Sequence, residues 1–350
     1  MTKRKNRTAA KRIPQPTRFL CLDQAISPAT TRAYRRDLDY FWAWAKVNGC
    51  PPRYPVPLAL LITFIDQHLA GLDLKTRTTL RRAGLKVMDS VWSIATLRRT
   101  LASLSVEHSI RGLPNPCKDP ALRLRVNRAA RLKTESLRRR RPITLDVLTL
   151  LLAACGKDLR GTRDRAILLV GFAGGGRRRS ELAALNVEDL EPVSEGYLAK
   201  LGRHKTRRFT GDGLRFPILG QAAGALDTWL RRSGIKSGPV FRGIDRHGNV
   251  LPAMVGRGIH RIVRRLVAKA GLPVREFGAH SLRIGFITQA ARQGIALPEA
   301  MAISGHRSIH MAWKYYRAGD VLENAAAHLG QRKKVNSRRR PLVMITRHKD

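Results

Sequence analysis

The sequence predicts a mainly α-helical protein of two domains, with a small β-hairpin or sheet in the second domain. Apolar residues recur at helical spacing through most of the 350 residues, and a strand pattern is confined to one short region. The length exceeds that of one average domain. Hydrophobic residues make up 43% of the chain, which is enough for a sizeable core and excludes disorder throughout.

The first domain is expected over residues 21–130 and to be entirely helical. Ser27 and Pro28 are favourable as an N-cap and a first helical residue, and an apolar stripe then continues as far as Gly49. Residues 112–116, Gly-Leu-Pro-Asn-Pro, interrupt the pattern before an arginine-rich helix that completes the domain. Between these points we expect helices over 56–69, 74–94 and 97–108.

A basic linker is expected over 131–142, because this stretch combines dense charge with a proline and a new helix start follows at Thr144. The second domain is expected over 143–330. Within it, residues 197–201 and 214–218 predict a hairpin of two short strands around a polar, glycine-containing turn. Helices are expected over 144–155, 162–172, 221–232, 257–270, 281–293, 298–303 and 308–316, with a last short one over 321–329.

The charge balance indicates a polyanionic partner. Lysine and arginine number 67 against 25 acidic residues, so the formal net charge is +42. Few soluble proteins tolerate such self-repulsion unless a polyanion is the working partner. Basic tails over 1–20 and 331–350 are expected to stay unstructured until bound. Charge alone leaves DNA, RNA and acidic membrane surfaces open, although no lipidation motif accompanies it.

Several kinds of site and location are disfavoured by the sequence. No apolar run reaches the roughly 20 residues of a membrane-spanning helix, and no signal peptide follows the basic start. The four cysteines lie far apart and suit neither a disulfide framework nor a zinc site: Cys21, Cys50, Cys117 and Cys155. No cluster of acids and histidines has metal-ligand spacing. We therefore expect a cytoplasmic protein without metal, cofactor or membrane partner.

Three local patterns in the second domain can carry chemistry. Residues 176–182, Gly-Arg-Arg-Arg-Ser-Glu-Leu, place arginines beside a carboxylate at a helix start, a setting that favours phosphate. Residues 280–283, His-Ser-Leu-Arg, put two cationic side chains on one helical face. Residues 304–306, Ser-Gly-His, are followed nine residues later by Tyr315. Each pattern alone is common in structural positions, but their combination and order are not.

Taken in order, these patterns resemble the tyrosine site-specific recombinases, or phage-integrase family. The resemblance covers about residues 142–330 and extends loosely to the first helix. The hairpin and the compact layout are similar to those of Cre-type recombinases. The resemblance to this family implies a two-domain clamp that closes around duplex DNA. The residues that carry it are Arg178, Ser180, Glu181, Leu182, Lys205, His280, Arg283, Gly305, His306 and Tyr315.

The resemblance also implies a role for each matching residue. Arg178 and Arg283 would clamp the phosphate on which negative charge develops. Tyr315 would be the covalent nucleophile. His280 and His306 would donate to a phosphate oxygen or assist proton transfer.

Two further roles and two choices between neighbours follow from the resemblance. Lys205 is the candidate general acid that protonates the leaving 5′ oxygen, and Glu181 would support the site by orienting its cations. Composition cannot choose among three consecutive arginines, but the Arg-x-Ser-Glu spacing selects Arg178. The interval from His306 favours Tyr315 over Tyr316.

The implied reaction is site-specific recombination of DNA through a covalent 3′-phosphotyrosine, without metal or ATP. The family assembles four protomers on two DNA sites, which implies a tetramer near the nucleoid, with residues 321–329 docking on a neighbour. A type IB topoisomerase or telomere-resolving enzyme would share this chemistry. A non-catalytic DNA-binding protein would explain the charge but not the ordered residues. The target site, the biological outcome and any accessory factors are not encoded in these patterns.

Overall fold

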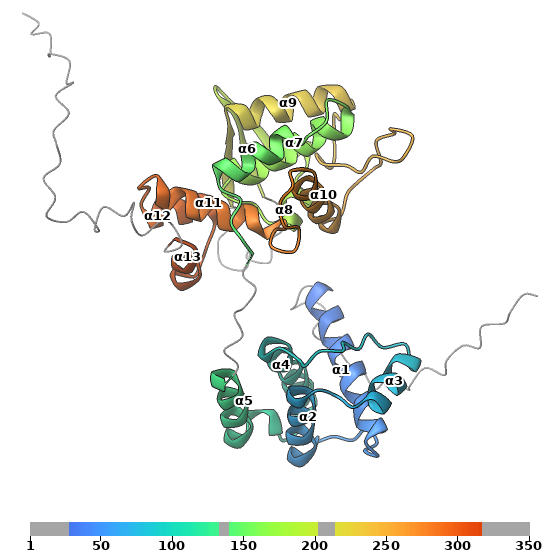
Figure 1. Ribbon diagram of the computed structural model, residues 1–350. Helices are drawn as coiled ribbons and strands as arrows, with labels where there is room; N and C mark the ends of the chain where they lie inside the picture. Colours follow the sequence, from blue (N-terminus) through green and yellow to red (C-terminus); the bar gives the residue numbers. More distant parts are fainter. Residues whose placement is uncertain (1–27, 133–139, 202–213, 317–350) are drawn as a thin grey trace, which may run out of the picture. The chain divides into compact units, whose positions relative to one another are not determined.

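The computed structural model describes residues 28–132, 140–201 and 214–316, which form helices and one small sheet (Figure 1). The predicted fold class, mainly helical with a small sheet, is confirmed. The chain divides into two compact units, Met1–Ser136 and Leu137–Asp350. That division falls within the range 131–142 that was expected to link two domains. The two basic tails, Ser27 and the helix expected over 321–329 lie outside the described residues.

The first unit is a helical bundle with an aromatic core. Phe41 and Trp44 of its first helix are fully buried and meet Phe64 of the second, with ring centroids 5.1 and 4.9 Å apart. Edge-to-face contacts of this kind add to the free energy gained by burying large rings. The helices are α1 (Pro28–Val47), α2 (Leu58–Ala70), α3 (Leu74–Arg82), α4 (Ile94–Ile110), the short η2 (Pro116–Lys118) and α5 (Pro120–Leu132).

The single helix expected over 74–94 is wrong, because α3 ends at Arg82 and the next helix begins twelve residues later, at Ile94. Gly84 adopts a left-handed conformation with φ of 80°, which ends the helix. Arg77 and Arg81 then bind Asp89 at 3.2 and 2.6 Å, so the connecting segment folds back onto α3.

The second unit holds most of the helices, close to where their apolar periodicity predicted them. The helices are α6 (Leu145–Ala153), α7 (Leu159–Ala173), α8 (Arg179–Ala184), the short η3 (Val187–Asp189), α9 (Gln221–Ser233), α10 (Gly256–Lys269), α11 (His280–Arg292), α12 (Leu297–Ser304) and α13 (Ile309–Tyr316). Helix α7 contacts both α9 and α11 and is central to this unit. Over the described ranges, no helix of either unit is long and apolar enough to cross a membrane.

The predicted hairpin is present and belongs to a three-stranded antiparallel sheet. Strands β2 (Gly196–Lys200) and β3 (Arg215–Leu219) pair with Tyr197 opposite Ile218, and β1 (Leu190–Val193) adds an outer strand. Strand β1 was not predicted, because it has only four residues and includes Pro192. Proline is tolerated there since β1 is an edge strand.

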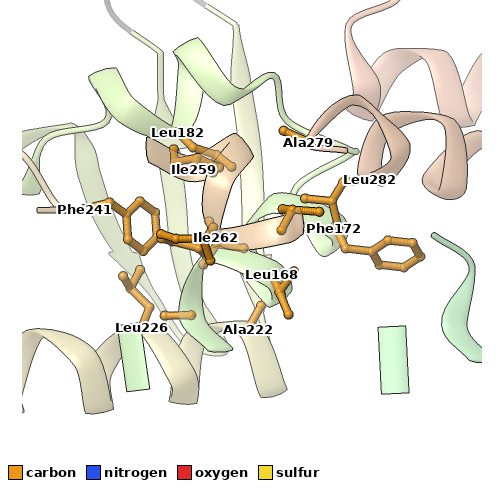
Figure 2. Close-up of a cluster of buried hydrophobic side chains, with 14 of the residues drawn as sticks. Leu168, Phe172, Leu182, Ala222, Leu226, Phe241, Ile259, Ile262, Ala279 and Leu282 are labelled. Atoms are coloured by element: carbon orange, nitrogen blue, oxygen red, sulfur yellow. The ribbon is translucent and has the colours of Figure 1, made fainter. Parts of the chain in front are cut away.

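The core of the second unit fixes the helices that carry the polar motifs. Figure 2 shows Leu182 of α8 beside Ile259 of α10, and Leu282 of α11 near Phe172 of α7. All four side chains are buried, and each contributes about 2 kcal/mol relative to exposure. A smaller cluster joins α11 to α12 and packs against the tyrosines of α13. Helix α11 is therefore held by apolar contacts on two sides.

Candidate active site

A glycine turn between α7 and α8 brings the first motif against α11. Gly175 and Gly176 have φ angles of 95° and 68°, which favour glycine. A Cβ atom on Gly176 would lie 2.5 Å from the Cα atom of Arg283. The turn therefore needs glycine both for its backbone conformation and for its close approach to α11.

Arg178 stands at the start of α8 and is paired with Glu181. Its backbone N–H donates to Glu181 Oε2 at 3.1 Å, and its Nη1 donates to Oε1 at 2.5 Å. The Arg178 side chain is 45% exposed, whereas that of Glu181 is 2% exposed. One buried carboxylate thus anchors an arginine whose guanidinium group reaches solvent.

Arg177 points the other way and is fully buried. Its Nη2 donates to the carbonyl oxygen of Ile303 at 2.6 Å, and its guanidinium carbon lies 4.7 Å from the ring centre of Phe216. Its Nη1 lies 3.8 Å from Glu181 Oε2. Burial lowers the pKa of Arg177 to about 10, so this guanidinium stays charged at neutral pH.

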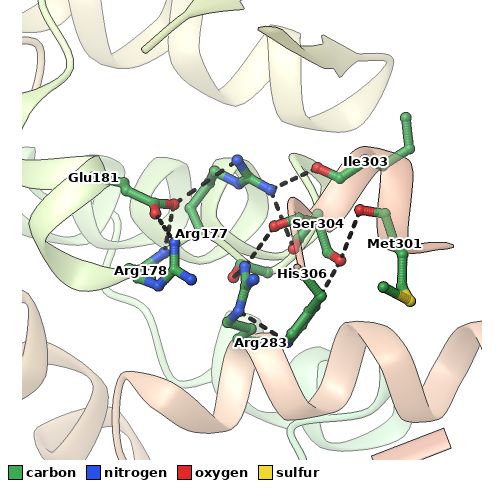
Figure 3. Close-up of polar contacts among 10 residues, drawn as sticks. Arg177, Arg178, Glu181, Arg283, Met301, Ile303, Ser304 and His306 are labelled. Atoms are coloured by element: carbon green, nitrogen blue, oxygen red, sulfur yellow. Dashed lines mark hydrogen bonds and ion pairs between the residues drawn. The ribbon is translucent and has the colours of Figure 1, made fainter. Parts of the chain in front are cut away.

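Arg283, His306 and Ser304 form a continuous hydrogen-bonded chain (Figure 3). Arg283 Nε donates to His306 Nε2 at 3.1 Å, and Arg283 Nη1 donates to the Ser304 carbonyl oxygen at 2.6 Å. His306 Nδ1 lies 2.7 Å from Ser304 Oγ, which lies 3.4 Å from the carbonyl oxygen of Met301.

These contacts fix the tautomer of the imidazole. A guanidinium group only donates, so His306 Nε2 accepts and the ring proton is on Nδ1. Nδ1 then donates to Ser304 Oγ, whose own proton is directed at Met301. Burial first, and then Arg283 and Arg178, lower the pKa of His306 to about 3. His306 is therefore neutral at physiological pH.

The ring of Tyr315, on α13, lies next to the ring of His280, the first residue of α11. Their ring centres are 6.1 Å apart at an interplanar angle of 75°. Partial desolvation, together with Arg283 and Arg178, lowers the pKa of His280. Thr288 of α11 donates to the carbonyl oxygen of Tyr315 at 3.2 Å, which ties α13 to α11.

The two adjacent tyrosines have different surroundings. The hydroxyl of Tyr316 donates to the carbonyl oxygen of Ile295 at 2.8 Å, and its ring stacks on Trp313. The ring of Tyr315 instead faces His280, and Tyr315 interacts electrostatically with Arg283. The Tyr316 hydroxyl is held by the protein backbone, while Tyr315 belongs to the cationic cluster.

Positive charge exceeds negative charge in this cluster. Three guanidinium groups lie in the cluster, but its one carboxylate, Glu181, is paired with only two of them, those of Arg177 and Arg178. Burial lowers the pKa of Arg283 to about 9, yet Arg283 makes no ion pair within the described residues. Its Nη2, like Nε and Nη1 of Arg177, is buried without a hydrogen-bond partner there. Unpaired donors and excess positive charge suit an anion with several oxygens, such as a phosphate.

The structure brings five of the six candidate catalytic residues together, with Glu181 beside them. These five are Arg178, His280, Arg283, His306 and Tyr315. Lys205 lies outside the described residues. The patterns gave no role to Arg177 or Ser304, although both stand inside the motifs that were selected. Among the described residues, no group of acids, histidines and cysteines could hold a metal ion.

Comparison with known proteins assigns the family. The model of the phage integrase family matches residues 141–321, which is more than half of the chain. The chain belongs to the phage integrase family. It is a tyrosine recombinase, one of the enzymes that break and rejoin DNA.

Curated relatives support this assignment along both units. An integrase/recombinase xerD homolog of Selenomonas ruminantium is 28% identical over 312 residues, covering 87% of this chain and 86% of the relative. The recombinase cre of Escherichia phage P1 is 23% identical, covering 68% of this chain and 74% of that protein.

Solved structures share the fold. The Tn1549 transposon integrase in complex with transposon right end DNA has a TM-score of 0.58 at 17% identity, covering 89% of this chain and 96% of that one. A lambda integrase dimer bound to a COC′ core site has a TM-score of 0.55 at 15% identity, covering 93% and 96%. At these identities the likeness concerns the fold alone.

Proposed function

We propose that this recombinase cleaves and rejoins DNA at a specific site through a 3′-phosphotyrosine on Tyr315, without metal or ATP. The observation that carries the proposal is the convergence of Arg178, Arg283, His306 and Tyr315 on one cluster with excess positive charge. Cations held in place before the reaction stabilise charge that develops on phosphate oxygens, and they do so without reorganisation.

The reaction balances without an outside reagent. The Tyr315 phenolate oxygen attacks phosphorus, the new O–P bond forms, and the bond from phosphorus to the 5′ oxygen breaks. The phenol proton passes to a base of the site, for which His280 beside Tyr315 is the candidate, and Lys205, the hairpin lysine, gives a proton to the leaving 5′ oxygen. A 5′ hydroxyl from a second duplex then reverses both transfers. Because the bond energy is kept in the phosphotyrosine, ATP has no task in strand exchange.

Arg178 and Arg283 are proposed to hold the two non-bridging oxygens. The exposed guanidinium of Arg178 and the unpartnered Nη2 of Arg283 supply donors from two different helices. His306 reaches a phosphate oxygen through Nε2 once that atom carries the proton, and for this the Arg283 Nε–H must turn from His306 to the phosphate. The Ser304 hydroxyl permits this change, because it can donate to Nδ1 as readily as it accepts from it.

The surroundings of the tyrosines support Tyr315 as the nucleophile. Tyr316 would have to give up its hydrogen bond to Ile295 and its stacking on Trp313 before it could attack. Tyr315 already lies within the electrostatic reach of Arg283.

Duplex DNA is the proposed partner, and a tetramer on two sites is the proposed assembly. Structures of similar fold were solved with DNA, among them the Tn1549 and lambda integrases. The net charge of +42 gives this chain the electrostatic attraction that a phosphate backbone requires. We further propose that the two units close around the duplex as a clamp.

Covalent trapping tests the proposal. Nicked suicide duplexes made from the DNA that flanks the gene should trap wild-type protein as a covalent adduct that protease removes. Tyr315→Phe should bind the same duplexes and form no adduct, because its ring lacks the attacking oxygen. Tyr316→Phe is the matched control and should still form adduct.

The outcomes separate the alternatives. Adduct at wild-type yield from Tyr315→Phe would show that another residue is the nucleophile. Relaxation of supercoiled DNA that has no specific site would favour a type IB topoisomerase. Binding without adduct in every variant would leave a non-catalytic DNA-binding protein.

A further inference from the structure

Glu181 is a buried carboxylate with two arginine neighbours. Its side chain is 2% exposed, Arg178 Nη1 binds Oε1 at 2.5 Å, and Arg177 Nη1 lies 3.8 Å from Oε2. Burial alone would raise the pKa of Glu181, but Arg177 first and Arg178 next offset burial and hold that pKa below its usual range. Glu181 is therefore ionised and needs a counter-ion.

The proposed chemistry makes a competing demand on Arg178. The guanidinium that pairs with Glu181 is also the one that should bind the scissile phosphate. The more closely the Arg178 guanidinium group pairs with Glu181, the less it can stabilise negative charge on the phosphate. If Arg178 left Glu181 altogether, a carboxylate shielded from water would be unpaired, and breaking a buried pair in this way is strongly unfavourable.

Arg177 has the geometry to relieve this conflict. It is fully buried, so it cannot itself be drawn to the DNA backbone. Its Nη1 and Nε have no hydrogen-bond partner within the described residues, and Nη1 is the Arg177 nitrogen that forms the ion pair with Glu181. A shift of less than about 1 Å would bring Nη1 within hydrogen-bond distance of Oε2.

Arg177 is also fixed from two other elements. Its Nη2 donates to the carbonyl oxygen of Ile303 at the end of α12, next to the residues that hold His306. Its guanidinium lies over the ring of Phe216 in β3. A Cβ on Gly175 would lie 2.6 Å from the same Ile303 oxygen and 2.8 Å from Arg177 Nη2, so glycine is needed to leave this space open.

We infer that Arg177 is a positioning residue: it is the resident counter-ion of Glu181, and it frees the guanidinium of Arg178 to bind the scissile phosphate. This inference rests on the proposed function, because it assigns a cause to the availability of Arg178. Arg177 touches neither DNA nor the nucleophile.

A double-mutant cycle in the full chain tests the inference. Arg177→Met keeps an apolar side chain of similar length against Phe216 and removes the charge. At saturating protein, its single-turnover rate of adduct formation on the suicide duplex should fall about 10-fold, because Arg178 stays on Glu181. The DNA dissociation constant should change less than about three-fold, since many other cations bind the backbone.

Removing the carboxylate should remove the need for its counter-ion. The double variant Arg177→Met with Glu181→Gln should react within about three-fold of Glu181→Gln alone, which is a non-additive result. A residue that only supported packing would give no such rescue. Arg179→Met is the matched control, because it removes an adjacent, exposed arginine that does not pair with Glu181.

Each result decides between defined alternatives. A wild-type rate for Arg177→Met, or a double variant as slow as the product of its single effects, would overturn the inference. If Arg177→Met does not fold, Arg177→Lys keeps the charge and should retain most of the rate, and a large loss there would also count against it. Absence of adduct from the wild-type protein would instead overturn the proposed function.

Discussion

The first unit and the candidate active site of the second unit handle buried charge in opposite ways. In the first unit, each buried carboxylate that the structure describes in an ion pair has its own arginine: Arg99 binds Asp37 through two bonds of 2.7 and 2.8 Å, and Arg111 binds Glu107 at 2.7 Å. In the candidate active site, Arg177 and Arg178 share Glu181, and Arg283 has no ion pair within the described residues. Buried charge is paired in the first unit and left in excess at this site; elsewhere in the second unit the buried Asp164 is paired, with Arg163 and Arg265.

The difference separates stability from function. An arginine and an acid that form an ion pair satisfy each other's charge and hydrogen bonds, so the pair needs no ligand from outside the protein. The buried N–H donors of Arg177 and Arg283 that have no acceptor lower the stability of the free protein. They lose their hydrogen bonds to water on folding and gain none within the described residues. On the proposed function, a phosphate supplies the acceptor that Arg283 lacks, and Glu181 supplies that of Arg177 once Arg178 binds the phosphate, so the unfavourable term becomes binding and catalytic free energy. The excess of cations is thus the feature that distinguishes the active site from the rest of the fold.

Substitution of Arg283 should have the largest effect on the cleavage rate. Its effects on rate and stability also test whether unpaired charge at the site serves function. Arg283→Met should lower the single-turnover cleavage rate by about 10² to 10³-fold, because a preorganised donor to the transition state is lost. Its free energy of unfolding should change by only about 1 kcal/mol, since the loss of its hydrogen bonds to His306 and Ser304 is offset by the removal of a buried cation without an ion pair. Rates on suicide duplexes and urea unfolding measure the two quantities.

Arg99→Met is the matched control in the other unit. It leaves the Asp37 carboxylate, which is 5% exposed, without its arginine and hydrogen-bonded to the Ser103 hydroxyl. The free energy of unfolding should fall by about 2 kcal/mol, discounted because Arg99 is half-exposed. The cleavage rate of folded protein should change little. Equal losses of stability in both variants would contradict the contrast between the units.

Each unit contains a histidine whose pKa is lowered by burial, His68 in the first and His306 in the second, so pH can be used to compare the two units. His68 donates from Nδ1 to the Phe64 carbonyl oxygen at 2.6 Å and accepts from the Tyr40 hydroxyl at 2.9 Å. Burial lowers the pKa of His68 to about 4, with the Phe64 hydrogen bond acting against it. Burial, with the arginines of the site, lowers that of His306 to about 3. Only His306 has cations beside it that a phosphate would neutralise.

Stability of the first unit should therefore fall as pH drops from 6.5 towards 4. Over this range the unfolded chain binds a proton at His68 that the folded chain does not, and the expected loss is about 2 to 3 kcal/mol. His68→Gln should remove that part of the pH dependence. Urea unfolding at pH 7 and 4.5, followed by fluorescence of Trp42, Trp44 and Trp92, compares the two proteins. Equal pH dependence in both would show that His68 is not the group responsible.

The sequence predicted the parts of the fold that follow from a repeated pattern. Helices with a clear apolar stripe, such as α10, were located within a residue or two. The helix expected over 74–94 was wrong, because Gly84 and the arginine contacts to Asp89 end α3 early. Strand β1 carries too few residues for alternation to be recognised. Local breaks depend on contacts that periodicity does not contain.

The candidate site shows the same limit at the level of single residues. Spacing selected Arg178 from three consecutive arginines, and in the structure it is Arg178 that pairs with Glu181 while reaching solvent. The burial of Arg177 could not be predicted, because arginine is almost never fully buried without a charged partner. Ser304 was only part of a motif until the fold placed its hydroxyl against His306.

Ser304 should give the smallest effect, one that belongs to function rather than stability. Ser304→Ala removes the partner of His306 Nδ1, so the ring loses both its fixed tautomer and part of its orientation. We expect the single-turnover cleavage rate to fall about five-fold, in keeping with the loss of one positioning hydrogen bond. Ser304→Thr keeps the hydroxyl and should recover most of the rate.

Nitrogen chemical shifts of the imidazole distinguish this role from simple packing. In the wild-type protein without DNA, the shifts of His306 should correspond to a proton on Nδ1, because Arg283 occupies Nε2. Ser304→Ala should move these shifts towards a mixture of tautomers, and His306→Gln identifies the signals by their loss. A wild-type rate with unchanged shifts in Ser304→Ala would mean that Arg283 alone orients the ring, and that the unpaired guanidinium groups suffice to prepare this site.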